Sequence, residues 1–451
     1  MSSERRAAGL RPAQLLAVGG MLFSMFFGAG NLILPPLLGL QAGDAAIPAM
    51  AGFLAAGIGL PVLGIVAVAV CGGVRELAGR VSPLFASVFI GLMYLTIGPF
   101  LAIPRTSSTA FEMLKPLLPA TDAAGLGVAA AVFSVAFFGV AFALALRPGL
   151  LSRVLGRFSA PALIALIVLV VGASLLGGSG SPTQPHAPYD ASPVSHGFLT
   201  GYQTMDLLAA LCFGIVVAAN VRELGVSDPK RVAGSVSGAG LIAGALMMAI
   251  YCGLAFVGAA MASSMSDAAN GASILTASAS AHFGAAGTVI VAAIFLLACL
   301  NVCTGLISCC SEYFSEAFPR IPLAAWAAAF AAFSCAVSLV GLDAILAFSA
   351  PLLGALYPPA IVLVAMGLAH KRCDRLPRMW PWAVLVTAAC SVAVALRDAF
   401  APGLWLPLDA LPLADAGLGW LLPALAGAAI GAAQSMRARR NAGPARGGDA
   451  G

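Results

Sequence analysis

Two short stretches in long apolar runs of this sequence resist forming a continuous helix. The first contains Gly28 and Gly30 and is followed by Pro35 and Pro36. Glycine costs a helix interior about 1 kcal/mol relative to alanine, and proline lacks the N–H group that a helix interior needs. A helix that breaks at membrane depth frees backbone N–H and C=O groups, which must find partners in protein, water or a ligand. We therefore interpret this stretch as a candidate binding site for an ion or a solute.

The second stretch runs from Gly201 through Tyr202 and Thr204 to Asp206. Its apolar run begins near Gly197, so Asp206 lies about 13 Å along a helix, close to the middle of a bilayer. A charge at that depth costs at least ~2.5–3.5 kcal/mol unless it is paired or hydrated, which makes Asp206 a candidate for handling a ligand or an ion. Asp is also a good N-cap, and both roles are compatible because a broken helix needs a cap.

Broken helices suit a zwitterion. The N-terminus of a half-helix has free N–H groups and a positive dipole end, which favour a carboxylate. Its C-terminus has free C=O groups, which suit an ammonium group or a metal cation. The neighbouring side chains are apolar and would favour an apolar substrate body: Phe26, Phe27, Met205, Leu207 and Phe213.

Thr304 and Ser308 are four residues apart in a later apolar run, so they lie near one stripe of a helix. Hydroxyl and carbonyl oxygens are suitable ligands for a small cation. The alternative is that both hydroxyls hydrogen-bond to the preceding turn of their own helix, which is common in membrane helices.

Arg105 ends the third apolar run. It lies about 31 Å along a helix from Leu84, which predicts a position towards the outer face of the membrane. There it could form half of a gate with Asp206 or Asp343. The alternative is an interfacial arginine whose side chain extends to the lipid headgroups.

The composition indicates an all-α polytopic membrane protein. The chain has 451 residues, of which 61% are hydrophobic and 9% are charged, whereas soluble proteins carry about 25% charged residues. The apolar runs are mostly about 20 residues long, which is the length that a membrane-spanning helix needs. No HExxH or GxSxG motif and no cluster of histidines is visible, so we expect no catalytic residues, no enzyme activity, no cofactor and no nucleic-acid partner.

Twelve membrane-spanning helices account for the apolar runs. With that number, 20 of the 23 basic residues lie on one side, which the positive-inside rule assigns to the cytoplasm together with both termini. The tail at 436–451 is Gly-, Ala- and Arg-rich and is predicted to be disordered. The spans are 13–40, 45–71, 84–105, 123–146, 158–177, 197–220, 233–262, 285–311, 323–341, 344–368, 380–397 and 416–435.

The two broken segments fall in spans one and six, five spans apart. Discontinuous helices in corresponding positions are typical of inverted-repeat transporters. We therefore predict a first repeat of five spans at 13–177 and a second, inverted repeat at 197–368. The last two spans, at 380–435, are additions outside the repeat.

Several motifs together resemble the bacterial branched-chain amino acid:cation symporter family, nearly from end to end. The resemblance implies a fold like that of the leucine transporter and its superfamily, and Na⁺-coupled import of leucine, isoleucine and valine across the bacterial inner membrane by alternating access. The motifs are Phe27-Gly28-Ala29-Gly30-Asn31-Leu32-Ile33-Leu34-Pro35-Pro36, Pro104-Arg105-Thr106, Gly201-Tyr202, Thr204-Met205-Asp206, Ala269-Asn270-Gly271-Ala272 and Tyr357-Pro358-Pro359.

The resemblance also implies roles for particular residues. Gly28, Ala29, Gly30 and Asn31 would contact the substrate, together with Tyr202, Thr204 and Asp206 from span six. Carbonyl groups near Ser24 and Phe27 would bind Na⁺ with Thr304 and Ser308, although the wider group has adjacent Thr and Ser residues at this point. The alternatives are a proton-coupled carrier or an amino acid exchanger of the same fold, in which Asp206 or Glu312 titrates, and a channel, for which no pore motif is visible.

Overall fold

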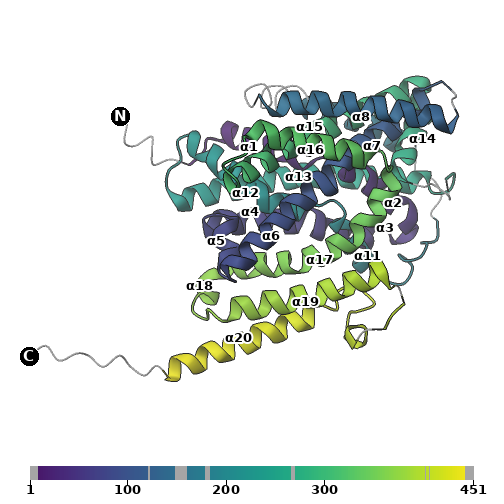
Figure 1. Ribbon diagram of the computed structural model, residues 1–451. Helices are drawn as coiled ribbons and strands as arrows, with labels where there is room; N and C mark the ends of the chain where they lie inside the picture. Colours follow the sequence, from purple (N-terminus) through teal and green to yellow (C-terminus); the bar gives the residue numbers. More distant parts are fainter. Residues whose placement is uncertain are drawn as a thin grey trace, which may run out of the picture.

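The computed structural model describes residues 9–119, 122–147, 160–177, 183–265, 270–401, 403–405 and 407–441, and these residues form helices and connecting segments without a strand (Figure 1). The helices are α1 (Pro12–Phe26), α2 (Ala29–Ala42), α3 (Ala46–Leu54), α4 (Leu60–Cys71), α5 (Val74–Gly79), α6 (Pro83–Leu95), α7 (Ala102–Leu114), α8 (Ala123–Ala145), α10 (Ala160–Leu176), α11 (Pro193–Tyr202), α12 (Asp206–Glu223), α13 (Pro229–Met261), α14 (Gly271–Phe283), α15 (Ala285–Ala317), α16 (Leu323–Ser338), α17 (Leu342–Leu368), α18 (His370–Cys373), α19 (Met379–Phe400) and α20 (Leu421–Asn441).

Within the described chain, seven helical stretches are long and apolar enough to cross a membrane. The prediction of an all-α membrane protein is therefore confirmed. Three shorter helices are also apolar: Pro12–Phe26, Pro161–Leu176 and Leu323–Ser338. The seven stretches are Ala29–Cys71, Pro83–Leu117, Ala123–Ala145, Pro229–Met261, Ala285–Ala317, Leu342–Leu368 and Met379–Phe400.

The first apolar run is broken between α1 and α2. Phe27 and Gly28 have extended backbones, with φ of −76° and −128°, so neither continues the helix. We expected Pro35 and Pro36 to help break the helix. They lie inside α2 and do not end it. Neighbouring helices make such prolines tolerable in a membrane helix.

The second break lies between α11 and α12, at residues 203–205. Met205 has a left-handed backbone conformation, with φ of +65°. An L-residue with a side chain pays about 1–2 kcal/mol for that conformation, and such strain is concentrated at functional sites. The chain therefore changes direction at the point where the sequence becomes polar.

Glycines bring the helices next to the breaks into backbone contact. A Cβ atom on Gly39 of α2 would lie 2.0 Å from a carbonyl oxygen of α13, and one on Gly258 of α13 would lie 1.9 Å from a carbonyl oxygen of α2. Gly52 of α3 and Gly197 of α11 form the same reciprocal pair, at 1.9 Å each. Small residues allow this close packing between membrane helices. Thus α2 packs on α13, and α11 packs on α3.

The third run is longer than expected, because it continues through a π-helical turn at Thr96–Phe100 into α7. Most residues of α7 are buried, and the helix packs against α15 and α16. Arg105 is therefore inside the protein, and its predicted position at the end of a span is wrong. The polar start of α7 ended the hydropathy signal but not the helix.

The C-terminal helices lie together at one edge of the molecule, where α19 packs against α17 and α20 (Figure 1). α20 continues to Asn441, so the segment at 436–441 is helical and not part of a disordered tail. The rest of the predicted tail, 442–451, lies outside the described residues.

Candidate functional site

Asn31 connects the two helix breaks. Its side-chain oxygen accepts a hydrogen bond from the Gly28 N–H at 3.2 Å, across the first break. Its amide nitrogen donates to Asp206 Oδ2 at 2.7 Å, at the start of α12, and also to the hydroxyl of Tyr251. All three hydrogen-bonding groups of this amide are therefore used to hold the broken segments to each other.

Tyr251 completes this network from α13. Its hydroxyl donates to Asp206 Oδ2 at 3.3 Å while accepting from Asn31. The residue is fully buried. Tyr251 was not predicted to belong to the site. Its hydroxyl is the only side-chain hydroxyl between Gly238 and Met261, which was a detectable signal, because buried polar groups need partners.

Asp206 is 2% exposed, and its carboxylate binds side chains of other helices. It is not the N-cap of α12, because Asp206 is the first residue of that helix and Met205 holds the capping position. Its own N–H donates to the Thr204 hydroxyl at 3.4 Å. Thr204 in turn donates to the carbonyl of Gly201 at 2.8 Å. The structure thus does not show Asp206 as the cap of α12, and it places Thr204 in the local turn; a ligand-handling role for Asp206 stays a prediction.

Arg105 reaches the same region from α7 and is 3% exposed. Its Nη1 donates to the carbonyl of Gln203 at 2.8 Å, inside the second break. Its Nη2 would lie 2.6 Å from a Cβ atom on Gly30, so the guanidinium also lies against the start of α2. Arg105 therefore lies beside both helix breaks. Its function as a gate stays a prediction.

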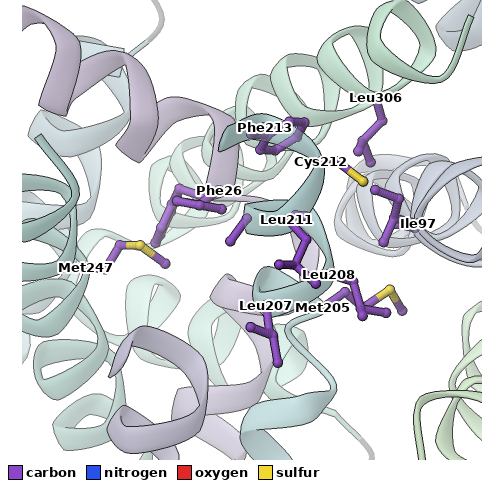
Figure 2. Close-up of a cluster of buried hydrophobic side chains, with 14 of the residues drawn as sticks. Phe26, Ile97, Met205, Leu207, Leu208, Leu211, Cys212, Phe213, Met247 and Leu306 are labelled. Carbon is purple, nitrogen blue, oxygen red and sulfur yellow. The ribbon is translucent and has the colours of Figure 1, made fainter. Parts of the chain in front are cut away.

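A narrow cavity of about 30 Å³ lies among these groups. Such a volume holds roughly two water molecules. Its apolar lining includes Phe26, Ile97 and Leu306 and, from α12 itself, Phe213. Figure 2 shows these side chains in a cluster of buried hydrophobic residues around α12. The predicted residues that line it are Gly28, Ala29, Asn31, Arg105, Thr204 and Asp206.

Tyr202 lies apart from the narrow cavity. Its ring stacks on Tyr357 of α17, with ring centroids 4.3 Å apart. Both Tyr202 and Gln203 line a second, wide cavity of about 680 Å³ between α11, α17, α19 and the segment before α20. Tyr202 therefore lies between the second break and the wide cavity.

The predicted cation ligands do not all meet. Thr304 donates to the carbonyl of Leu300 at 2.7 Å, as the back-bonding alternative expected, and Ser308 donates to a carboxylate oxygen of Glu312 at 3.3 Å. The α15 residues that line the narrow cavity are Val302 and Leu306. Thr304 is two residues from each, about 200° around the helix, so it faces away from the cavity.

Ser24 and Phe27 are at the end of α1. The Ser24 hydroxyl is buried and has no hydrogen-bond partner among the described residues. The last turn of a helix also leaves carbonyl groups without intrahelical partners. Phe27, which follows α1, keeps its N–H bonded to the carbonyl of Phe23 at 2.8 Å. This end of α1 therefore offers several oxygen atoms to a cation.

Comparison with known proteins places this architecture in a sequence family. The family model described as "Branched-chain amino acid transport protein" matches residues 11–437. The branched-chain amino acid permease BraB of Bacillus subtilis is 36% identical over 423 residues, which cover 92% of this chain and 94% of that protein. The branched-chain amino acid transport system 2 carrier protein of Pseudomonas aeruginosa is 38% identical over 417 residues, covering 92% and 94%.

Solved structures share the fold. The nucleobase-cation-symport-1 family transporter Mhp1, in a closed conformation with bromovinylhydantoin bound, aligns with a TM-score of 0.62 and 14% identity over 95% of this chain and 93% of that one. MhsT in complex with L-phenylalanine aligns with a TM-score of 0.55 and 16% identity over 87% and 99%. At such identities the likeness concerns the fold alone.

Proposed function

Since this chain belongs to the branched-chain amino acid transport protein family, we propose that it imports leucine, isoleucine and valine across the bacterial inner membrane, coupled to Na⁺. The observation that carries this proposal is the network in which Asn31 joins both helix breaks around a narrow cavity. A lining that combines apolar side chains with the charged groups of Arg105 and Asp206 suits a small amino acid with an aliphatic side chain.

The chain is an integral membrane protein, because it belongs to a transporter family and has several helices long and apolar enough to span a bilayer. The family and the relatives reported above are transport proteins, carriers and permeases, which are not enzymes.

The full topology is part of the proposal. We assign twelve spans, with repeats at 13–177 and 197–368 and both termini in the cytoplasm. The breaks after α1 and after α11 support this assignment, because they occupy corresponding positions in the two predicted repeats. The distribution of basic residues supports the same orientation.

Transport requires the site to open. The narrow cavity, at about 30 Å³, is far smaller than the roughly 300 Å³ or more of a typical ligand pocket. The state described here, in which the narrow cavity is too small for an amino acid, must therefore alternate with states in which the half-helices separate. Phe27–Gly28 and Gln203–Met205 are the non-helical segments that could absorb such a movement, since hinges are a few terminal residues of helices.

Na⁺ is best accommodated at the end of α1. Arg105 repels and Asp206 attracts a cation in the narrow cavity, so the charges that line it do not by themselves select it as the Na⁺ site. The buried Ser24 hydroxyl, which has no hydrogen-bond partner among the described residues, and nearby carbonyl groups are the ligands that we assign to Na⁺. A proton-coupled carrier is the second candidate, and the buried carboxylate of Asp206 favours it.

Uptake into proteoliposomes tests the proposal. The purified protein would be reconstituted, and accumulation of radiolabelled leucine measured with an inward Na⁺ gradient, with a pH gradient, and with neither. Accumulation driven by Na⁺ supports the proposed symport. Uptake that needs the pH gradient and ignores Na⁺ identifies proton coupling, and uptake of no branched-chain amino acid refutes the proposed function.

A further inference from the structure

A buried anion and a buried cation face the same narrow cavity. Asp206 and Arg105 are both almost completely inaccessible to solvent, and both line the cavity. Yet none of the ion pairs within 4.0 Å that the described residues form joins Arg105 to Asp206. The two charges attract each other only over a longer distance. A buried charge without a direct partner is costly, so each group also needs hydrogen-bonding partners.

The compensation of Asp206 is one-sided. Asn31 and Tyr251 both donate to Oδ2, and neither donates to Oδ1. A carboxylate has about four acceptor positions on its two oxygens. The carboxylate therefore keeps acceptor capacity towards the cavity that it lines.

The compensation of Arg105 is also incomplete. A guanidinium has five N–H donors, and one of them donates to the carbonyl of Gln203. Its Nε is buried and has no hydrogen-bond partner among the described residues. Donors in this arrangement are suited to the planar oxygens of a carboxylate.

The start of α2 increases the need for an anion. The N–H groups of the first turn of a helix have no intrahelical acceptor, and they carry a partial positive charge. Asn31 accepts the hydrogen bond of the Gly28 N–H. The first turn of α2 begins after Gly28, at Ala29, so that hydrogen bond does not satisfy the N–H groups of this turn. Because Arg105 Nη2 lies against Gly30, a full and a partial positive charge meet at one place.

We propose that Arg105 binds the carboxylate of the transported amino acid and that Asp206 binds its ammonium group. This assignment rests on the proposed function. The two charged groups of an α-amino acid are attached to one carbon atom, so both can be bound within a single small site. The side chain then faces the apolar wall formed by Phe26, Ile97 and Phe213.

Analogues that lack one charge test this assignment. 3-Methylbutylamine is leucine without its carboxylate, and 4-methylpentanoate is leucine without its ammonium group. Affinities would be measured by displacement of radiolabelled leucine from the purified wild-type protein, the Arg105→Gln variant and the Asp206→Asn variant, all at saturating Na⁺. Arg231→Gln is the matched control, because Arg231 is half exposed and pairs with Asp228 away from the site.

We expect wild type to bind leucine roughly 10- to 100-fold more tightly than either analogue, as for the loss of one charged hydrogen-bonding partner. Arg105→Gln should lower the affinity for leucine by a similar factor. Its affinity for 3-methylbutylamine, which has no carboxylate, should stay within about threefold of the wild-type value. Asp206→Asn should lower the affinity for leucine. It should leave the affinity for 4-methylpentanoate, which has no ammonium group, unchanged or increase it. Arg231→Gln should match wild type.

The alternatives give different patterns. If Arg105→Gln lowers the affinities for leucine and for 3-methylbutylamine equally, Arg105 only stabilises the structure of the site, and the assignment is wrong. If wild type binds an analogue as tightly as leucine, the assignment fails even where a variant does not fold, because that comparison needs no variant. If wild type binds no leucine at all, the proposed function fails. This result differs from the one in which wild type binds leucine and an analogue equally tightly, which refutes only the assignment.

Discussion

Replacing Asn31 by alanine should uncouple the two helix breaks. The variant removes one hydrogen bond to a carboxylate, which is worth about 1.5–3 kcal/mol, and two bonds to neutral groups, worth about 1 kcal/mol each. Water that enters the space beside the narrow cavity would recover part of this, since a bridging water is nearly as good as a direct bond. We therefore expect the arrangement of the two breaks to lose about 3 kcal/mol of stability. Leucine affinity should fall by up to roughly 100-fold, because binding then has to restore that arrangement.

Leucine binding and uptake measure this loss, and thermal unfolding shows whether the purified variant is folded. Asn220→Ala is the matched control, because Asn220 lies near the other end of α12 and is not part of the network. We expect the control to behave as wild type. Leucine affinity within about threefold of wild type in Asn31→Ala would show that Asn31 does not organise the site.

A charge swap sharpens the test. Asn31→Asp alone places a second carboxylate about 2.7 Å from Asp206 Oδ2, the present hydrogen-bond distance, and like charges so close cannot both ionise. The double variant Asn31→Asp/Asp206→Asn can still accept from Gly28 and Tyr251. We expect it to regain thermal stability but not leucine affinity, because the negative charge has moved to the other helix break. Recovery of both would contradict a specific role for the Asp206 carboxylate.

Three further substitutions probe the same site. Gly30→Ala should weaken leucine binding in the displacement assay, because its Cβ would lie 2.6 Å from Arg105 Nη2, so the guanidinium would have to move from its present position. Tyr251→Phe removes the donor to Asp206 and should lower leucine affinity about 10-fold, by loss of about 1.5 kcal/mol; unchanged affinity would make the hydroxyl a packing feature. Ser24→Ala should raise the Na⁺ concentration for half-maximal uptake severalfold, whereas Thr304→Ala should leave it unchanged because that hydroxyl bonds its own helix; the reverse pattern would place the cation on α15.

Local chemistry determined where the helices break. Glycine lacks helix propensity, and a polar turn is costly in an apolar run, so both breaks were identifiable from residue types alone. Asp206 was identifiable for the same reason. The prolines were misleading, because their effect depends on whether neighbouring helices stabilise the unbonded carbonyls, and in α2 they do not end the helix.

Position along the chain was a poor guide to Arg105. Hydropathy ends a span where the residues become polar, but α7 continues because its polar residues are buried between other helices. The direction of Thr304 was also not available from spacing. A four-residue interval with Ser308 defines a stripe on the helix, and only the packing of α15 decides whether that stripe faces the narrow cavity or its own backbone.

The sequence by itself determined the all-α membrane class, the two breaks and the family, because these depend on composition, local propensity and motif order. Only the tertiary structure decided that Asn31, Asp206 and Tyr251 meet, with 175 residues separating Asn31 from Asp206 and 220 separating it from Tyr251. It also brought Arg105 into the lining of the same cavity. Such contacts depend on how helices pack, and close glycine contacts between backbones set that packing here.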